Sequence, residues 1–159
     1  MNERDELGTD RVPDYLTSVR EGAIYGWPCA YRGPDVDRRV QPQNGQTVQA
    51  TVRPDFALQS HSAPLGLSFV QPGLAAPFAE GAFIGLHGSW NRDEPVGYKM
   101  IFVPFANGRA SGPPVDFVTN FEVDGKTTGR PVGVSFDPEG ALIVADLLSN
   151  TAWRVTPAR

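Results

Sequence analysis

Two short apolar runs near the middle of the chain enclose a polar stretch, and this pattern predicts a β-hairpin. The first run is residues 82–86 and the second is residues 100–105. Both are rich in aromatic and β-branched residues and lie next to Gly or Pro, as is typical of strands rather than helices. Residues 87–94 lie between them and supply an imidazole, an indole, an amide and charged groups. The loop of this hairpin is therefore either a ligand-binding loop or a solvated tip.

Weaker patterns predict further strands around this hairpin. Residues 65–70 and 115–121 are short and apolar, and Asn107-Gly108 is a turn signal. Residues 32–53 show no sustained apolar period, although a short edge strand could run through residues 48–52, where Val and Ala alternate with polar residues.

The beginning of the chain is polar, and one helical segment is expected there. Asp14 can cap one or two helical turns over residues 14–20, and Gly22 suits the exit from such a helix.

The strand pattern occurs twice in the second half of the chain. Three segments recur in the same order: PLGLSF at 64–69 as PVGVSF at 131–136, GAFI at 81–84 as GALI at 140–143, and the strand at 100–105 as 152–156. Imperfect repeats of antiparallel strands are typical of propeller blades. A β-sandwich would give no reason for the two copies to share residues such as Gly66 and Gly133. The sequence therefore predicts an all-β fold, a partial β-propeller of about two to three blades, with 1–53 rich in loops and 54–159 forming two repeated blades.

Composition and charge exclude several classes of protein. The chain has 159 residues, 40% hydrophobic and 20% charged, which indicates a globular domain. Gly 17 and Pro 15 favour many turns and few long helices. The net charge of -4 argues against a nucleic-acid partner, and no apolar run is long enough to span a membrane. With one cysteine, Cys29, no disulfide can form within the chain.

A propeller has at least four blades, and this chain is long enough for about two and a half. The chain is therefore expected to be a piece of a longer protein, since NERDELG at its start reads as the middle of a loop, or to complete a ring with other copies. An incomplete ring exposes sheet edges and an inner face, so self-association through those open edges is also expected.

Motifs along most of the chain resemble the sorbosone/glucose dehydrogenase family. These are NERDELG, YGWP, SxPLGLSF, GAFIGxHGSWNR, GYKxIFVPF and GRPVGVxFDPxGALxVAD followed by NTxWRV. Members of this family are soluble quinoproteins that bind pyrroloquinoline quinone (PQQ) on a six-bladed β-propeller. The resemblance omits residues 32–53, covers the C-terminal portion of the family only, and is greatest to the sorbosone dehydrogenase-like branch, for which HGSWNR is characteristic.

This resemblance implies oxidation of sugars or sugar-derived aldehydes with PQQ. In the family a calcium ion polarises the quinone carbonyl, and a histidine takes the proton of the substrate hydroxyl. That histidine belongs to the family's N-terminal half, so no catalytic residue is assigned in this chain. Family members are commonly periplasmic, which is the expected location, although the charged N-terminus shows no signal peptide.

The resemblance also implies cofactor-binding residues. Arg130 stands where the family places an arginine against PQQ, whereas a second arginine of the glucose-oxidising relatives is replaced by Val132. Asn91 stands near a cofactor lysine of those relatives, so Arg92 beside it would supply the charge. An arginine can hold a carboxylate through two parallel hydrogen bonds. The alternative for each arginine is a surface ion pair with a neighbouring acid, such as Asp93 or Asp137.

Two histidines and a possible metal site complete the candidates. His61 and His87 each flank a predicted strand, and each either contacts cofactor or substrate or is a hydrogen-bonded structural residue. Glu6 matches a glutamate that binds a structural calcium in the family, and the backbone carbonyl of Tyr25 matches its partner, although the two are further apart in sequence here. The alternative for Glu6 is a solvated loop carboxylate.

A second class of function stays open at this point. Because the second arginine and the lysine are replaced at Val132 and Asn91, the chain could instead be a non-catalytic propeller module that binds a glycan or a protein partner.

Overall fold

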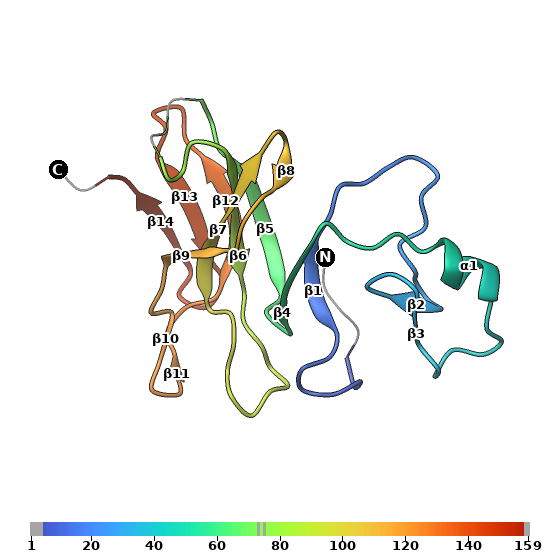
Figure 1. The fold of residues 1–159 in the computed structure, drawn as a ribbon. Coiled ribbons are helices and arrows are strands. Elements are labelled where there is room, and N and C mark those ends of the chain that lie inside the picture. Colours follow the sequence, from blue (N-terminus) through green and yellow to red (C-terminus); the bar gives the residue numbers. More distant parts are fainter. Residues whose placement is uncertain (1–4, 73, 75, 158–159) are drawn as a thin grey trace. The chain divides into compact units, whose positions relative to one another are not determined.

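The computed structural model describes residues 5–72, 74 and 76–157, and it divides into two compact units, Met1–His61 and Ser62–Arg159 (Figure 1). In the described residues the chain forms fourteen short strands and one helix of six residues. No helix in this described part is long and apolar enough to cross a membrane. The nearly all-β content confirms the predicted fold class.

The first unit contains two small antiparallel sheets and the helix. Strand β1 (Pro13–Leu16) pairs with β4 (Phe56–Ser60), and β2 (Ala30–Tyr31) pairs with β3 (Asp35–Val36). Helix α1 (Gly45–Ala50) lies between β3 and β4 in the chain.

Both secondary-structure predictions for the first unit are wrong. Residues 14–16 of the segment expected to be helical belong to β1 instead, because β4, which is distant in sequence, supplies hydrogen bonds that no local pattern indicates. Asp14 is fully buried there instead of capping a helix. Residues 48–50 of the expected edge strand belong to α1 instead. The helix has an N-terminal cap at Asn44, whose side chain accepts a hydrogen bond from the Thr47 N–H at 3.1 Å.

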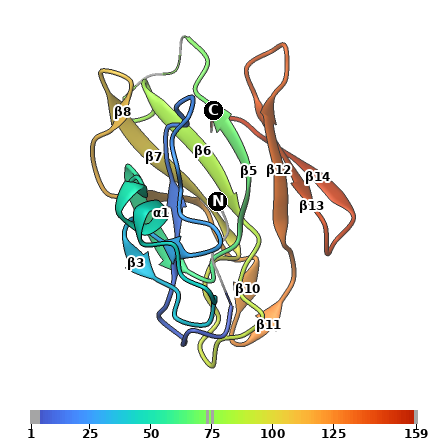
Figure 2. The same ribbon diagram turned by 90° about the vertical axis from the view of Figure 1, so that its right-hand side faces the viewer.

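The second unit begins with a sheet that matches the predicted strands. Strands β5 (Pro64–Phe69), β6 (Gly81–Leu86) and β7 (Lys99–Ala106) lie side by side in that order (Figure 2). Both β8 (Arg109–Ala110) and β9 (Val115–Val118) pair with β7. The expected turn is also present. Asn107 and Gly108 have φ values of 53° and 73°, the left-handed region that a two-residue hairpin requires.

A second sheet repeats the first. Strands β12 (Pro131–Phe136), β13 (Leu142–Asp146) and β14 (Thr151–Val155) form an antiparallel sheet, and a small hairpin of β10 (Glu122–Val123) and β11 (Lys126–Thr127) precedes it. Every strand in both sheets is antiparallel to its neighbours, as in a propeller blade. We call these two sheets the first blade and the second blade.

The strand register corrects the sequence alignment of the middle strands by one residue. Ser68 pairs with Phe83 in the first blade, and its counterpart Ser135 pairs with Ile143 in the second. Phe83 therefore corresponds to Ile143, whereas matching the letters GAFI and GALI had aligned it with Leu142. A shift of one residue exchanges the two faces of a strand, so the register decides which side chains are equivalent.

An apolar core joins the two blades of this unit. Phe83, Met100 and Phe102 of the first blade pack with Leu142 and Val144 of the second, and all five are buried. Phe78, Phe117 and Phe136 surround this cluster, and their rings lie between 4.6 and 5.9 Å from those of Phe83 or Phe102. Tilted and edge-on rings at these distances add to the free energy gained by burial.

The first strands of the two blades approach each other closely at Gly66. A Cβ atom at this position would lie 2.2 Å from the Val132 carbonyl oxygen and 2.9 Å from the Val134 nitrogen. Its counterpart Gly133 has ordinary room, since a Cβ there would lie 3.4 Å from the Ala145 side chain. Glycine at Gly66 is therefore required by the contact between blades.

Each blade thus has two different faces. The face of the first blade that carries Gly66, Phe83 and Phe102 packs against the second blade. By register, the equivalent face of the second blade carries Gly133, Ile143 and Arg154, and these residues do not belong to the core between the blades.

Candidate functional site

The candidate site lies where β6 ends and β12 begins. Arg130 directly precedes β12, and His87 directly follows β6. The Arg130 guanidinium lies 3.2 Å from Nδ1 of His87 and donates to the backbone carbonyls of His87 and Gly88 at 3.4 and 3.2 Å. It also donates to the Tyr98 hydroxyl at 3.3 Å, and its carbon lies 4.8 Å from the centre of the Tyr98 ring. The cluster therefore draws one side chain from the second blade and its partners from the first.

The acceptors around Arg130 are all neutral. They are an imidazole nitrogen, two backbone carbonyls and a phenol, and no ion pair of Arg130 with a carboxylate occurs among the residues that the structure describes. The guanidinium is half-buried and held in place, yet its positive charge is not cancelled locally. Such a group can bind a carboxylate or another anion.

The contact with Arg130 determines the proton position on His87. A guanidinium can only donate, so Nδ1 of His87 must accept, and the proton of the neutral ring is on Nε2. Burial lowers the pKa of His87 and the positive charge of Arg130 lowers it further, although a backbone hydrogen bond at Gly88 opposes this. His87 is therefore a neutral ring at pH 7 with Nε2–H available as a donor.

Tyr98 and Ser89 fix the loop between β6 and β7. The Tyr98 hydroxyl donates to the Ser89 carbonyl, and the Ser89 hydroxyl accepts from the Val96 N–H at 3.1 Å. Gly88 has a φ of 99°, and a Cβ there would lie 2.5 Å from the Tyr98 ring. The loop thus closes tightly over the tyrosine that supports Arg130.

Asp146 at the end of β13 supports Arg130 from the second blade. Its buried carboxylate accepts from the backbone N–H groups of Arg130 at 2.8 Å, Leu148 at 3.1 Å and Ser149 at 3.3 Å, and from the Trp153 indole at 3.3 Å. Burial alone would raise the pKa of Asp146, but these hydrogen bonds to the charged form lower it below its ordinary value. Asp146 therefore fixes the backbone from which the Arg130 side chain extends.

The structure brings His87 and Arg130, two of the five predicted cofactor residues, into direct contact. Arg92 belongs to the same loop as His87, and its guanidinium donates to the Glu94 carbonyl at 3.3 Å. Asn91 is half-buried in that loop. His61 belongs to the other unit, where its Nε2 lies 3.1 Å from the Gly8 carbonyl oxygen.

The predicted calcium ligands are also in the first unit. Glu6 is exposed, and its carboxylate lies near enough to Arg39 to raise the pKa of that guanidinium, after the larger effect of Asp37. The Tyr25 hydroxyl donates to the Ser18 carbonyl at 2.9 Å. Among residues 5–72, 74 and 76–157, no three His, Cys, Asp or Glu side chains are grouped closely enough to hold a metal. The calcium site at Glu6 and the Tyr25 carbonyl therefore stays a prediction.

Sequence reasoning missed Tyr98, Ser89 and Asp146. Tyr98 reads as the beginning of an apolar strand and Asp146 as the acid after one, so nothing in their neighbourhood distinguishes them from ordinary strand ends. A comparison of the two repeats distinguishes Asp146. By register it corresponds to Leu86 in the first blade, so the second blade has a carboxylate where the first has an apolar side chain.

The state of His87 can be tested by pH titration. Because its pKa is lowered in the folded protein, its contribution to the free energy of unfolding is complete above the unfolded pKa of about 6.5 and is lost as the pH falls through that value toward the folded pKa. We expect the ring protons of His87 to titrate below pH 6.5 in NMR spectra, with His61→Gln used to assign them.

In Arg130→Gln the titration midpoint of His87 should rise without reaching the ordinary value, because burial, the larger cause, persists. An unchanged midpoint in this variant would show that the guanidinium does not act on the ring.

Comparison with known proteins gives a consistent family of relatives. A family model described as TrAA12-like matches residues 35–152. The chain is 27% identical over 161 residues to an uncharacterized protein from Borreliella burgdorferi, and 39% identical over 70 residues to a pyrroloquinoline quinone-dependent pyranose dehydrogenase from Coprinopsis cinerea. These matches cover 97% and 41% of this chain, but 41% and 9% of the two relatives.

Solved structures of similar fold are also found. A calcium structure of Trichoderma reesei carbohydrate-active enzyme family AA12 matches with a TM-score of 0.72 at 22% identity, over 92% of this chain and 43% of that one. The holo form of the pyranose dehydrogenase PQQ domain from Coprinopsis cinerea matches with a TM-score of 0.57 at 27% identity, over 74% and 32%. A glucose dehydrogenase matches with a TM-score of 0.66 at 18% identity, over 96% and 39%. These likenesses confirm the predicted partial β-propeller, and the chain spans about two fifths of such relatives.

Proposed function

The chain belongs to the TrAA12-like family, and we propose from this that it is part of a PQQ-dependent oxidoreductase that acts on sugars. The relatives named for PQQ dependence support the cofactor class. The observation that carries the proposal is the Arg130 cluster, a held guanidinium whose acceptors are all neutral. PQQ carries three carboxylates, and a carboxylate is the group that such a cation binds best.

Two residues of this chain would contact the cofactor in this proposal. Arg130 would hold a carboxylate, and Nε2–H of the neutral His87 would donate to a second oxygen. Tyr98 and Asp146 would act through Arg130, one by supporting its side chain and the other by fixing its backbone. When bound, the quinone supplies the two-electron oxidant, and the residues described here bind and orient it.

The finer predictions are part of the same proposal. We assign sorbosone or aldose-type substrates and a sugar-derived aldehyde as candidates, with Arg92, Asn91 and His61 as further cofactor contacts and Glu6 and the Tyr25 carbonyl as calcium ligands. A periplasmic location belongs to this group of predictions too. No step of the reaction is assigned to calcium, because no three His, Cys, Asp or Glu side chains are grouped among the described residues.

Binding is the appropriate test, because no catalytic base is assigned in this chain, which spans about two fifths of the solved relatives. We expect the 159-residue chain to bind PQQ with a shifted quinone absorbance, and Arg130→Gln to weaken binding at least about tenfold, as the loss of a charge-assisted hydrogen bond predicts. Arg109→Gln is the matched control, since it removes the same charge from the exposed residue after the Asn107-Gly108 turn.

Equal affinity in the parent, Arg130→Gln and Arg109→Gln would contradict the assignment of Arg130. Failure of the parent to bind PQQ, with or without calcium, would favour a propeller module that binds a glycan or a protein instead. Dye reduction with aldoses in the presence of PQQ and calcium would show that these blades suffice for catalysis.

A further inference from the structure

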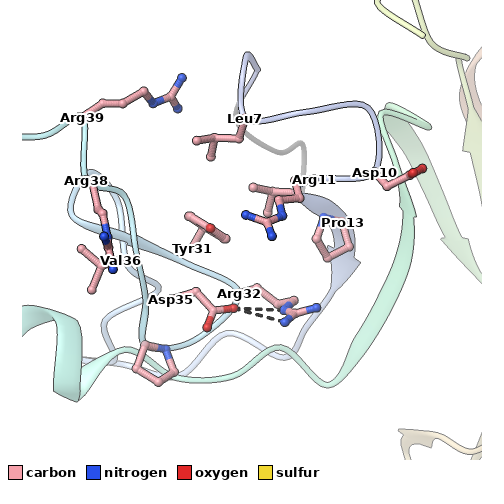
Figure 3. A pocket seen from close by; sticks show the side chains of 12 residues that line it. Leu7, Asp10, Arg11, Pro13, Tyr31, Arg32, Asp35, Val36, Arg38 and Arg39 are labelled. Atoms are coloured by element: carbon pink, nitrogen blue, oxygen red, sulfur yellow. Dashed lines mark hydrogen bonds and ion pairs between the residues drawn. The ribbon is translucent and has the colours of Figure 1, made fainter. Parts of the chain in front are cut away.

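The first unit contains an open pocket with four arginines among its twelve lining residues. It has a volume of about 750 Å³ and lies among the segment before β1, the β2–β3 hairpin and the residues that follow β3. A volume of this size is ordinary for a small-molecule site. Its cationic lining residues are Arg11, Arg32, Arg38 and Arg39, and its acidic ones are Asp10 and Asp35 (Figure 3).

Two of the four arginines are fixed by carboxylates. Arg39 donates to both oxygens of the fully buried Asp37 at 3.0 and 2.9 Å, and to the Asp5 carbonyl at 2.8 Å. Arg32 donates to Asp35 from two nitrogens, each at 3.2 Å. These pairs hold the wall of the pocket in place and neutralise half of its positive charge.

The positive charges of the other two arginines are not paired with a carboxylate among the residues that the structure describes. In the part of the chain that the structure describes, the side chains of Arg11 and Arg38 form no ion pair or hydrogen bond. Figure 3 shows the Arg11 guanidinium directed toward Tyr31 and the Asp10 carboxylate directed away from both. Two cations from separate segments thus line one pocket, in a protein whose net charge is -4.

We propose that this pocket binds a small polyanion that carries carboxylate or phosphate groups. Arg11 and Arg38 supply forked donors that match either group, and the half-buried Tyr31 offers a hydroxyl between the segments. Leu7, Pro34 and Val36 provide apolar surface for the carbon part of such a ligand. Because the overall charge of the chain repels anions, binding here depends on this local group of arginines.

The experiment uses calorimetric titration of the 159-residue chain with citrate and with pyrophosphate at constant ionic strength. We expect one saturable site, with an affinity that falls as salt is raised. Arg11→Gln/Arg38→Gln should weaken binding at least about tenfold. Arg20→Gln/Arg109→Gln removes the same two charges outside the pocket, and we expect less than about a twofold change from it.

Two results would overturn the proposal: no saturable binding of either anion by the parent, or equal weakening in the two double variants. Circular dichroism of each variant separates lost binding from lost structure. The ratio of the citrate and pyrophosphate affinities identifies the source of the anion, carboxylate or phosphate. The variant Arg11→Lys/Arg38→Lys retains both positive charges but loses the paired donors of the guanidinium groups. It should bind the two anions with intermediate affinity.

Discussion

Replacing Gly66 by alanine is expected to lower the free energy of unfolding of the second unit by about 3 kcal/mol. The new Cβ would lie 2.2 Å from the Val132 carbonyl oxygen and 2.9 Å from the Val134 nitrogen, and both are backbone atoms. A flexible side chain could rotate away from such a contact, but here the two blades must move apart. That movement would loosen the aromatic core between them, so the loss should exceed the effect of an ordinary Gly-to-Ala change.

The repeat supplies a matched control at Gly133. The same substitution there places a Cβ 3.4 Å from the Ala145 side chain, an ordinary contact, and we expect a change within about 1 kcal/mol. Denaturant unfolding monitored by tryptophan fluorescence measures both variants. Similar losses in the two would show that the close approach at Gly66 does not limit the packing of the blades.

The second large effect is expected for Asp146→Ala, which should lower the free energy of unfolding by about 4 kcal/mol. The buried carboxylate accepts from three backbone N–H groups and the Trp153 indole, and these donors would lose their partner in a site that water reaches poorly. Asp116→Ala is the control, because the exposed Lys99–Asp116 ion pair at 2.8 Å should contribute less than about 1 kcal/mol.

The pH dependence gives a second, independent check on Asp146. Its pKa is lowered in the folded protein, so its contribution to stability is complete above the unfolded pKa of about 3.9 and is lost as the pH falls through the folded pKa. The difference in unfolding free energy between the parent and Asp146→Ala should therefore narrow below pH 4. A difference that stays constant into acid would mean that the carboxylate does not titrate as described.

The sequence predicted the elements whose stability is local or repeated. The alternation and apolar runs around Phe83 and Met100 identified the strands of the first blade, and Asn107-Gly108 identified a turn whose backbone geometry few other residues allow. The duplication of the PLGLSF motif then identified the second blade, because packing requirements repeat when the architecture repeats.

The remaining elements depend on partners that are distant in sequence. β1 forms because β4 pairs with it, and no property of residues 13–16 alone predicts that pairing. At the site, His87 and Arg130 could be proposed from a family resemblance, but Tyr98 and Asp146 act through hydrogen bonds whose geometry exists only after the two blades have packed. Residues that position others leave little trace in a single sequence.

The difference between the two blade faces has a consequence for the kind of surface that can pack against the second blade. Where the first blade carries Phe102, the exposed face of the second carries Arg154, which forms ion pairs with Asp137 at 2.7 Å and Glu139 at 2.6 Å. Those ion pairs raise the pKa of Arg154, so the charge persists at every physiological pH. An apolar surface that packed on this face would have to dehydrate the Arg154 cation, at a cost that contact with Ile143 and Ala145 would offset only in part. An apolar surface is thus disfavoured as a neighbour of this face, whereas a polar surface could leave the ion pairs of Arg154 in place.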